Sequence, residues 1–339
     1  MSNFEYCDLP MYSQAHRNAV SEMMAPLRSK HVRSPADDRV TAAMDELLAN
    51  RERNLASPES EMRMGLLILG ASGAGKSRMV RKRIASRPDL ARTDPPEEAR
   101  PFVSVKLEAP VKLRSMGYQT RLAQGYGVSK MQEKDAQWPD VKRRIAALKT
   151  SVFHYDEAQD VFLTANRNEV KAVRSTWKSL MTNHANPVVV VLSGTKALQP
   201  YMDVDVQERR RFIRIELPEI SPDSHLDDVK GYVDSYCAQA NITNGLQPDD
   251  YERLIHAADG QFGWTYARAL DGIAEVLASG GTTLTRLALA HAYDRAGNAD
   301  PALNVFVVDY WRHLLPDAGL REEVPPEKLR RRPRKEQAS

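Results

Sequence analysis

The chain has 339 residues, 42% of them hydrophobic and 27% charged, a composition typical of globular proteins and of a length that favours two domains. The formal net charge is only +3, so any argument for nucleic-acid binding must come from local basic patches. The two cysteines, Cys7 and Cys237, lack metal-ligand spacing and fit a reducing compartment. No apolar run approaches the length of a membrane span, and the N-terminus lacks a signal-peptide pattern. We therefore expect a cytoplasmic protein with no membrane partner.

The first 60 residues carry no catalytic signature. Residues 1–31 are interpreted as an N-terminal extension of undetermined order. The stretch from Pro35 to Val40, followed by apolar Met44 and Leu47, predicts a capped amphipathic helix. Residues 32–39 precede the first predicted strand, where they either line a nucleotide pocket or only cover an edge of the sheet.

A phosphate-binding motif follows the first predicted strand. The apolar run from Leu66 to Leu69 meets G-x-x-x-x-G-K-[ST], and a helical segment from Lys76 to about Ser86 follows. Glycines let backbone N–H groups surround phosphate oxygens, and the helix directs its positive dipole end at the same anion. Lys76 is predicted to reach the β- and γ-phosphates and Ser77 to bind Mg²⁺, so ATP and Mg²⁺ are the expected ligands. The residues assigned to the nucleotide are Gly70, Ala71, Ser72, Gly73, Ala74, Gly75, Lys76 and Ser77.

A basic region lies after the second predicted strand, residues 102–107. The stretch from Lys112 to Met131 is basic, with Tyr118 and Tyr126 among its basic side chains. These basic residues are Lys112, Arg114, Arg121 and Lys130. Basic residues with aromatic neighbours suit a nucleic-acid backbone, although a solvated surface has the same composition.

The third predicted strand, Ser151 to Asp156, is mostly apolar and ends in two carboxylates. Asp156 is predicted to hold Mg²⁺, and Glu157 to orient and deprotonate the attacking water. His154 lies within this strand and has no partner histidine nearby in the sequence. It is interpreted as a core histidine or one that supports the site from behind, not as a ligand.

The fourth predicted strand is the apolar run from Pro187 to Leu192, preceded by a helix from about Glu169 to His184. It ends at Ser193-Gly194-Thr195, at the sheet edge where open α/β folds bind ligands. Either hydroxyl could sense the γ-phosphate, and an ordinary turn is the alternative.

Three arginines, Arg209 to Arg211, directly precede the alternating fifth strand, residues 212–217. They would lie away from the nucleotide bound by their own subunit and could reach the γ-phosphate of a neighbouring one. A solvated basic loop is the alternative.

From Pro218 the pattern changes to helical segments separated by Asn, Gly and Pro, which predicts a small helical domain. Arg268, near the start of its third helix, either moves onto the nucleotide or lies on the surface. Residues 301–315 have the composition of a packing or docking element, and Lys328 to Lys335 form a basic tail that could bind DNA, bind a partner or only aid solubility. The predicted helices span Asp227–Ala240, Pro248–Ala258, Trp264–Ala278 and Thr285–Ala296.

Together these features resemble the AAA+ ATPases of the initiator and clamp-loader type and, within them, the TniB/TnsC family of transposition regulators. The resemblance covers roughly residues 32–296 and rests on PADDRVTAAMDELL, GASGAGKS, HYDEAQ, SGT and RRRF. The chain departs from the family at His154 and Tyr155, where relatives often have Ile or Val. The resemblance implies an α/β AAA+ P-loop NTPase fold with a five-stranded parallel sheet and a C-terminal helical lid. The expected parts are residues 1–31, 32–217, 218–300 and 301–339.

The resemblance also implies a mechanism. ATP-bound subunits would assemble head to tail on double-stranded DNA, as rings or a helical filament that contacts phosphates without sequence specificity. The assembly would recruit a DDE transposase and a target-selector protein of the TniQ type, and hydrolysis would disassemble it. The competing class is an ATPase switch in signalling or phage defence that acts on a protein partner without DNA. The implied roles are phosphate binding by Lys76, Mg²⁺ binding by Ser77 and Asp156, water activation by Glu157, γ-phosphate sensing by Thr195, nucleotide contact by Arg268, and an arginine finger at Arg211 with Arg210 as second candidate.

Overall fold

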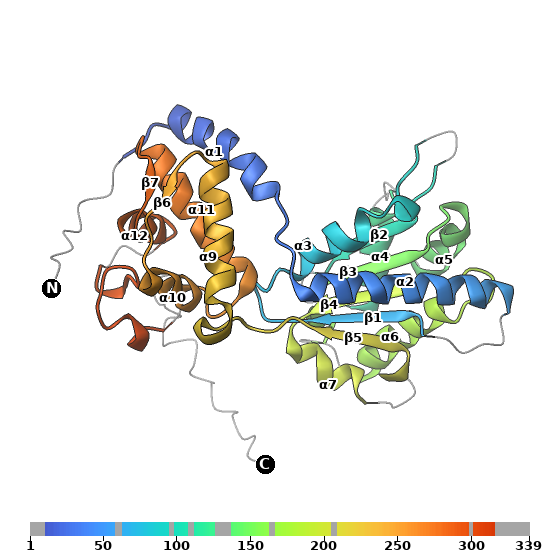
Figure 1. Ribbon diagram of the computed structural model, residues 1–339. Coiled ribbons are helices and arrows are strands. Elements are labelled where there is room, and N and C mark those ends of the chain that lie inside the picture. Colours follow the sequence, from blue (N-terminus) through green and yellow to red (C-terminus); the bar gives the residue numbers. More distant parts are fainter. Residues whose placement is uncertain are drawn as a thin grey trace, which may run out of the picture. The chain divides into compact units, whose positions relative to one another are not determined.

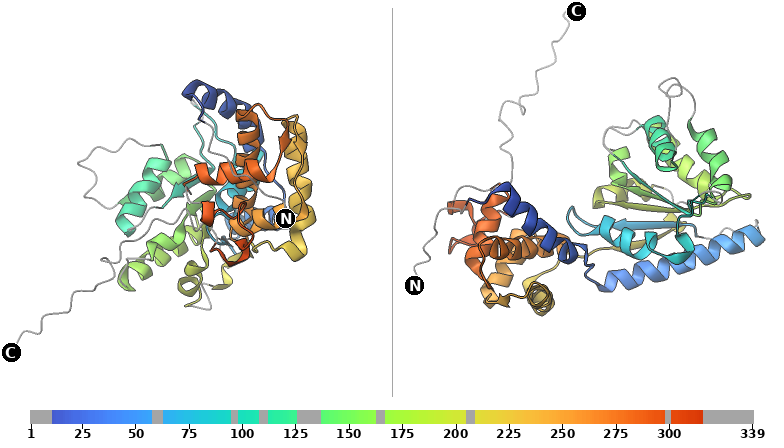
Figure 2. Two further views of the ribbon diagram at one scale, coloured as in Figure 1. Left: turned by 90° about the vertical axis from the view of Figure 1, so that its left-hand side faces the viewer. Right: turned by 90° about the horizontal axis from the view of Figure 1, so that it is seen from above.

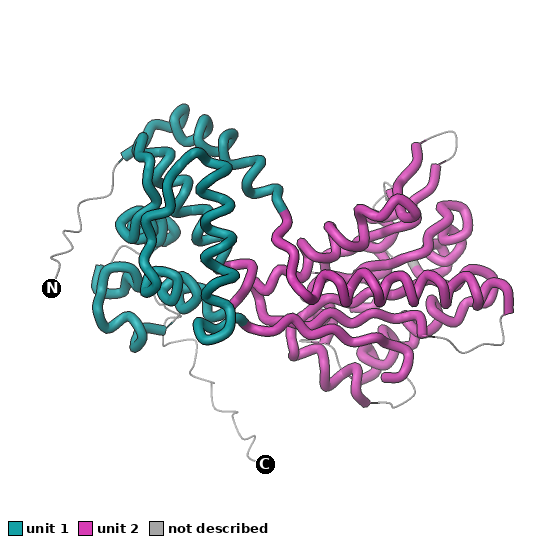
Figure 3. Tube along the Cα trace, viewed as in Figure 1, with its two compact units in different colours: residues 1–30, 220–260, 265–339 teal, residues 31–219, 261–264 magenta. Residues whose placement is uncertain are grey.

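The computed structural model (Figure 1) describes residues 11–57, 63–94, 98–107, 112–125, 137–162, 167–204, 209–297 and 301–315. The chain divides into two compact units (Figure 3). The sheet unit contains residues 31–219 and 261–264, and the helical unit contains residues 1–30, 220–260 and 265–339. Across the part of the chain that the structure describes, none of the helices has the length and apolar character needed to cross a lipid bilayer.

The sheet unit is built on five parallel strands in the order β2-β3-β4-β1-β5. Three of them, β1, β3 and β4, are buried along their whole length, which explains their continuous apolar runs. Leu69 pairs with both Gly194 and Glu216, so the carboxyl ends of β1, β4 and β5 meet at one edge. The predicted five-stranded parallel sheet is confirmed. The strands are β1 (Gly65–Leu69), β2 (Phe102–Lys106), β3 (Val152–Asp156), β4 (Val189–Gly194) and β5 (Phe212–Glu216).

Helices cover both faces of this sheet. The view from above in Figure 2 shows α2, in blue, on one face and α4 and α5, in green, on the other. Right-handed crossovers place the helices between β2 and β3 on the face opposite the helix between β1 and β2, because the chain moves outward from β1 to β2 and then back across β3 and β4. The predicted helix after the phosphate motif is α3, continued by the π-helical turn η1 (Arg81–Ala85). The helices of this unit are α2 (Pro35–Ala56), α3 (Lys76–Val80), α4 (Leu113–Ala123), α5 (Gln137–Ala147), α6 (Arg167–Met181) and α7 (Gln199–Met202).

A buried carboxylate, Asp37, joins the segment before α2 to the helix that follows the phosphate motif. It accepts hydrogen bonds from His31 Nε2 at 2.5 Å, Arg83 Nε at 2.7 Å, and the backbone N–H and hydroxyl of Ser34 at 2.7 and 2.8 Å. Burial opposes ionisation, but these hydrogen bonds outweigh it and hold the pKa of Asp37 well below its usual range. The N-terminus of α2, the predicted capped helix, is therefore joined to η1 by the ion pair between Asp37 and Arg83.

The helical unit contains the four predicted segments and one helix that the sequence pattern did not predict. That additional helix is α1, formed by residues 14–29. It is held to α11 by hydrogen bonds from Tyr12 to Glu275 and from His16 to the carbonyl of Ala278. A parallel pair of two-residue strands, β6 (Thr243–Asn244) and β7 (Thr283–Leu284), also lies here. The helices are α1 (Gln14–Ser29), α9 (Pro222–Gln239), α10 (Pro248–Ala257), α11 (Phe262–Ala278) and α12 (Arg286–Arg295).

Residues 301–315, predicted to pack or dock, lie against the helices of this unit. Arg253 donates to the carbonyls of Val305 and Val308, and the side chain of Asn304 is fully buried. Trp311 is also buried. The predicted basic tail, residues 328–335, lies outside the described residues, as do Tyr126 and Lys130.

We predict that Asp37→Asn lowers the free energy of unfolding at pH 7 by about 1.5–3 kcal/mol, the range for hydrogen bonds to a charged group. The pKa of Asp37 is depressed in the folded state, so its contribution is present above the unfolded pKa and is lost as pH falls through the folded pKa. Urea denaturation at pH 7 and pH 3 should therefore give a smaller difference at pH 3.

Asp38→Asn is the matched control, because Asp38 is exposed and forms an ion pair with Arg33, which is exposed too. Its unfolding curve should overlay that of the wild type. Equal stability of Asp37→Asn and Asp38→Asn at pH 7 would contradict the anchoring role of Asp37.

Candidate nucleotide-binding site

The phosphate motif forms the connection between β1 and α3. Gly73 and Gly75 have φ values of 80° and 94°, in the region that favours glycine, and Gly75 is the N-cap of α3. A loop of this shape directs backbone N–H groups at a common point beside the helix N-terminus. Residues 70–77 thus form a turn with two glycines at positive φ that leads from β1 into the N-terminus of α3, and their binding of a nucleotide stays a prediction.

The start of α11 packs on this loop within the sheet unit. A Cβ built on Gly73 would lie 2.4 Å from the indole ring of Trp264, and one built on Gly263 would lie 2.5 Å from the carbonyl oxygen of Gly73. Neither contact leaves room for a side chain. Glycine is therefore required at both positions by close approach.

Lys76 lies folded back on the loop. Its Nζ donates to the carbonyl oxygens of Gly70 and Ala71 at 2.9 and 2.8 Å, and its side chain is buried. Burial lowers the pKa of Lys76, and the nearby carboxylates of Glu157 and Asp156 offset part of that effect. The ammonium group is therefore held at the loop by carbonyls that an anion can replace.

Asp156, at the end of β3, accepts hydrogen bonds from hydroxyl groups on two sides. Ser77 Oγ donates to its Oδ2 and Ser193 Oγ donates to its Oδ1, each at 2.6 Å. Burial raises the pKa of Asp156, but these two hydrogen bonds and the nearby His154 hold it below its usual value. The structure thus brings together the two residues that the sequence assigned to Mg²⁺.

His154 lies behind this pair. Its Nε2 is 2.7 Å from Ser193 Oγ, and its Nδ1 is 2.8 Å from the hydroxyl of Ser104 on β2. Complete burial lowers the pKa of His154 to about 4, against the opposing charge of Asp156. It is therefore neutral at pH 7. This buried position is compatible with both interpretations of His154, a core histidine and one that supports the site from behind.

Gln159 joins Glu157 to Thr195 at this edge, a role that the sequence analysis did not predict. Its Nε2 donates to Glu157 Oε2 at 2.7 Å, while its Oε1 accepts the backbone N–H of Thr195 at 3.0 Å. Glu157 has a φ of 53°, which turns the chain directly after β3. The only available signal was the position of Gln159 two residues beyond Glu157.

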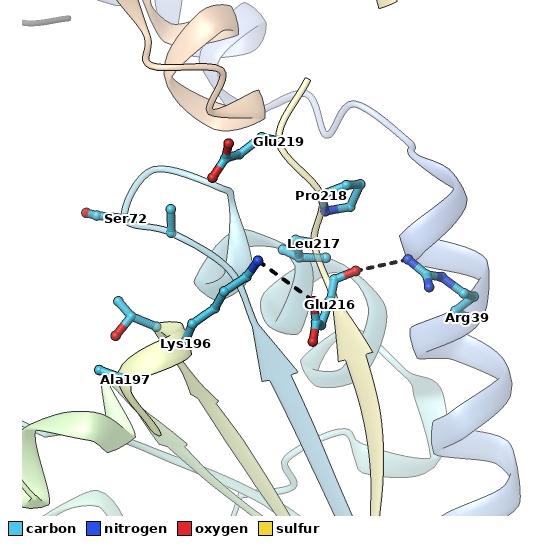
Figure 4. Close-up of a pocket in the computed structure, with 10 residues that line it drawn as sticks. Arg39, Ser72, Lys196, Ala197, Glu216, Leu217, Pro218 and Glu219 are labelled. Atoms are coloured by element: carbon cyan, nitrogen blue, oxygen red, sulfur yellow. Dashed lines mark hydrogen bonds and ion pairs between the residues drawn. The ribbon is translucent and has the colours of Figure 1, made fainter. Parts of the chain in front are cut away.

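A cleft of about 730 Å³ lies beside the phosphate loop, at the carboxyl edge of β1, β4 and β5 (Figure 4). Ser72 and Thr195 line it, together with an ion pair of 3.9 Å between Lys196 and Glu216. Arg39 donates to the carbonyl of Glu216 at 3.0 Å from the opposite wall. Thr195 therefore lines the same open cleft as the phosphate loop. Arg39, the last residue of the segment 32–39, lines it too.

The arginines that precede β5 lie at the other end of the strands. The carbonyl of Arg211 accepts the N–H groups of Met64 and Gly65 at the amino end of β1. Five residues of parallel strand separate this point from the phosphate loop, roughly 17 Å at the usual rise. Arg211 is half-buried and Arg210 is exposed. The structure therefore does not bring either arginine to the site of its own chain.

Arg268 belongs to the helical unit, where it contacts that unit's own residues. Its Nε donates to the carbonyl of Ala257 at 3.0 Å, and its guanidinium lies 4.8 Å from the ring centre of Tyr293. Burial lowers the pKa of Arg268. Nucleotide contact by Arg268 remains a prediction.

The sequence profile of the family described as "Bacterial TniB protein" matches residues 30–222. The chain belongs to the TniB family. No protein with a curated description matches it. TniB proteins were the family that the motifs resembled, so that prediction is confirmed.

Several solved structures are similar to this chain at low sequence identity. Cdc6p from Pyrobaculum aerophilum matches this TniB-family chain with a TM-score of 0.54 and 13% identity, over 84% of this chain and 73% of that one. ORC2 from Aeropyrum pernix, in ADPNP and ADP complexes, has a TM-score of 0.48 and 14% identity over 86% and 71%. RuvB from Thermotoga maritima, a Holliday junction branch migration motor, has a TM-score of 0.43 and 10% identity over 80% and 76%. The fold is that of the AAA+ P-loop ATPases, as predicted.

Membership of the TniB family supports an ATPase with a transposition-related function.

We predict that Gly194→Ala lowers stability, because a Cβ there would lie 2.4 Å from Gln159 Oε1. The expected loss is about 1–3 kcal/mol, as for other overpacked sites. Gly231→Ala is the control, since no atom lies within 4 Å of a Cβ on that glycine of α9. The free energy of unfolding of this control should rise by up to about 1 kcal/mol. Differential scanning calorimetry measures both, and an unchanged transition in Gly194→Ala would contradict the close packing of Gln159.

Proposed function

We propose that this protein binds ATP with Mg²⁺ at the loop of residues 70–77 and hydrolyses it. The observation that carries this proposal is the pair of 2.6 Å hydrogen bonds to Asp156, which hold an ionised carboxylate against the Ser77 hydroxyl beneath the phosphate loop. A hydroxyl and a carboxylate are the hard oxygen donors that suit Mg²⁺, which keeps several waters when it binds beside phosphates. Among the described residues no group of three or more His, Cys, Asp and Glu side chains could hold a metal.

Each residue of the site has a defined task in hydrolysis. The ammonium of Lys76 would exchange the carbonyls of Gly70 and Ala71 for β- and γ-phosphate oxygens. Gln159 holds Glu157 Oε2, which leaves Oε1 to take a proton from the attacking water. Thr195 faces the same cleft and would sense the γ-phosphate. Mg²⁺, when bound, would neutralise charge on the phosphate oxygens.

We propose that the arginine finger comes from a neighbouring subunit. Arg211 and Arg210 precede β5 at the edge opposite the phosphate loop, so they could serve only a nucleotide held by another copy of the chain. A contact between unlike faces is heterologous and generates rings or helical filaments. A homo-oligomer of that kind is therefore part of the proposal.

The proposed activity of the oligomer is assembly on double-stranded DNA, with recruitment of a DDE transposase and a target selector of the TniQ type. Membership of the TniB family supports this proposal. Of the predicted basic residues, Lys112 and Arg114 are exposed on or beside α4 and suit phosphate contacts. Arg121 is buried and pairs with Asp140 at 3.2 Å, so it is not a candidate for DNA contact.

We predict that Glu157→Gln binds ATP normally but hydrolyses it about 10²–10⁴-fold more slowly, because the amide cannot accept the proton of water. Assemblies on DNA should then persist, which sedimentation with DNA would detect. Lys76→Ala should lose nucleotide binding and sedimentation together. Normal turnover by Glu157→Gln would contradict the role of Glu157.

A mixing experiment tests the finger. Arg211→Ala subunits have intact phosphate sites but give no finger, whereas Glu157→Gln subunits give a finger but cannot hydrolyse. Each protein alone should be inactive, while an equal mixture should restore hydrolysis at about a quarter of the head-to-tail interfaces. The same mixture with Arg210→Ala decides between the two arginines. If neither mixture regains activity, the proposal of a finger in trans is wrong.

A further inference from the structure

Three polar side chains from three adjacent strands form a row that ends at Asp156. Ser104 on β2 contacts His154 on β3, and His154 contacts Ser193 on β4 at 2.7 Å. Ser193 then donates to Asp156. Ser193 is completely buried, His154 is 2% exposed, and Ser104 lies at the surface. The row therefore runs from solvent to the carboxylate through the interior of the sheet.

The number of protons on these groups fixes the direction of each hydrogen bond. Ser193 has one hydroxyl proton, which it gives to Asp156 Oδ1. Its oxygen must therefore accept from His154, so Nε2 carries a proton. In the neutral imidazole Nδ1 then has a lone pair, and the hydroxyl of Ser104 donates to it. One tautomer, with Nε2 protonated, satisfies every member of the row.

We propose that His154 is a positioning residue for Asp156, which it orients through the hydroxyl of Ser193 for binding of the divalent cation. This inference rests on the proposed function. The Nε2–H of His154 donates to Ser193 Oγ, so the Ser193 proton points at Oδ1 of Asp156. The other carboxylate oxygen of Asp156, Oδ2, then faces Ser77 and would keep this orientation when a cation binds. Groups that orient a metal ligand in this way change metal affinity or activity about 10–100-fold when they are removed.

An ordinary core role for His154 has a different expectation. A histidine that only fills space could be replaced by a leucine at some cost in stability, without a change in cation dependence. An imidazole inside an otherwise apolar strand requires partners for both nitrogens, and both are present here.

The test is the Mg²⁺ dependence of ATP hydrolysis by the full-length chain with His154→Leu and His154→Gln. The leucine variant should raise the half-saturating Mg²⁺ concentration about tenfold or more. The glutamine variant keeps an N–H donor near the position of Nε2 and should restore most of the wild-type value. An unchanged Mg²⁺ dependence in the leucine variant, or equal shifts in both variants, would overturn the proposal.

Ser193→Ala provides the same test without a large change in the core. It should shift the Mg²⁺ dependence as much as His154→Leu, whereas Ser104→Ala, which leaves the contact with Asp156, should shift it less. The opposite order would overturn the proposal.

NMR detection of the His154 ring nitrogens should find the proton on Nε2, and a proton on Nδ1 alone would also overturn it. If the wild type lacks Mg²⁺-dependent turnover, the proposed function fails, whereas wild-type turnover with unshifted Ser193→Ala overturns this inference alone.

Discussion

Two hydroxyl groups from different parts of the chain donate to one carboxylate at the edge of the sheet, Ser77 and Ser193 to Asp156. A buried carboxylate is costly unless its oxygens are hydrogen-bonded, so these two contacts permit an ionised Asp156 at this point. The parallel register supplies the geometry, because β1, β3 and β4 end at the same edge. Every other group of the site is arranged around this carboxylate.

The two ends of the strands carry different groups of the site. Their carboxyl ends hold the phosphate loop, Asp156 and Glu157, while their amino ends hold Arg210 and Arg211. Among the described residues of the sheet unit, both arginines therefore lie away from the phosphate loop of their own chain, whereas Arg39 lies in the cleft beside it. The proposed oligomer rests on this separation, since the opposite edge of a second copy would carry Arg210 and Arg211.

Features set by local sequence were predictable. The apolar strands, the glycine loop and the four helices of the helical unit follow from run length, periodicity and breaker residues. Helix α1 was not predicted, because its anchors, such as Glu275, lie more than 200 residues away. The roles of Gln159 and Ser104 were also hidden, since hydrogen bonds between side chains on neighbouring strands leave no pattern in one sequence. His154 was noticed only because a polar ring interrupts an apolar strand.

We propose that ATP at the phosphate loop controls assembly on DNA. Fluorescence anisotropy of a labelled random-sequence duplex, with ATP, ADP or no nucleotide and over a range of salt concentrations, tests this proposal. We expect binding that requires ATP, ignores sequence and weakens steeply with salt, as contacts to phosphates do. Binding that is equal without nucleotide would contradict the claim. So would an absence of binding while hydrolysis is intact, which would instead favour a switch that acts on a protein partner.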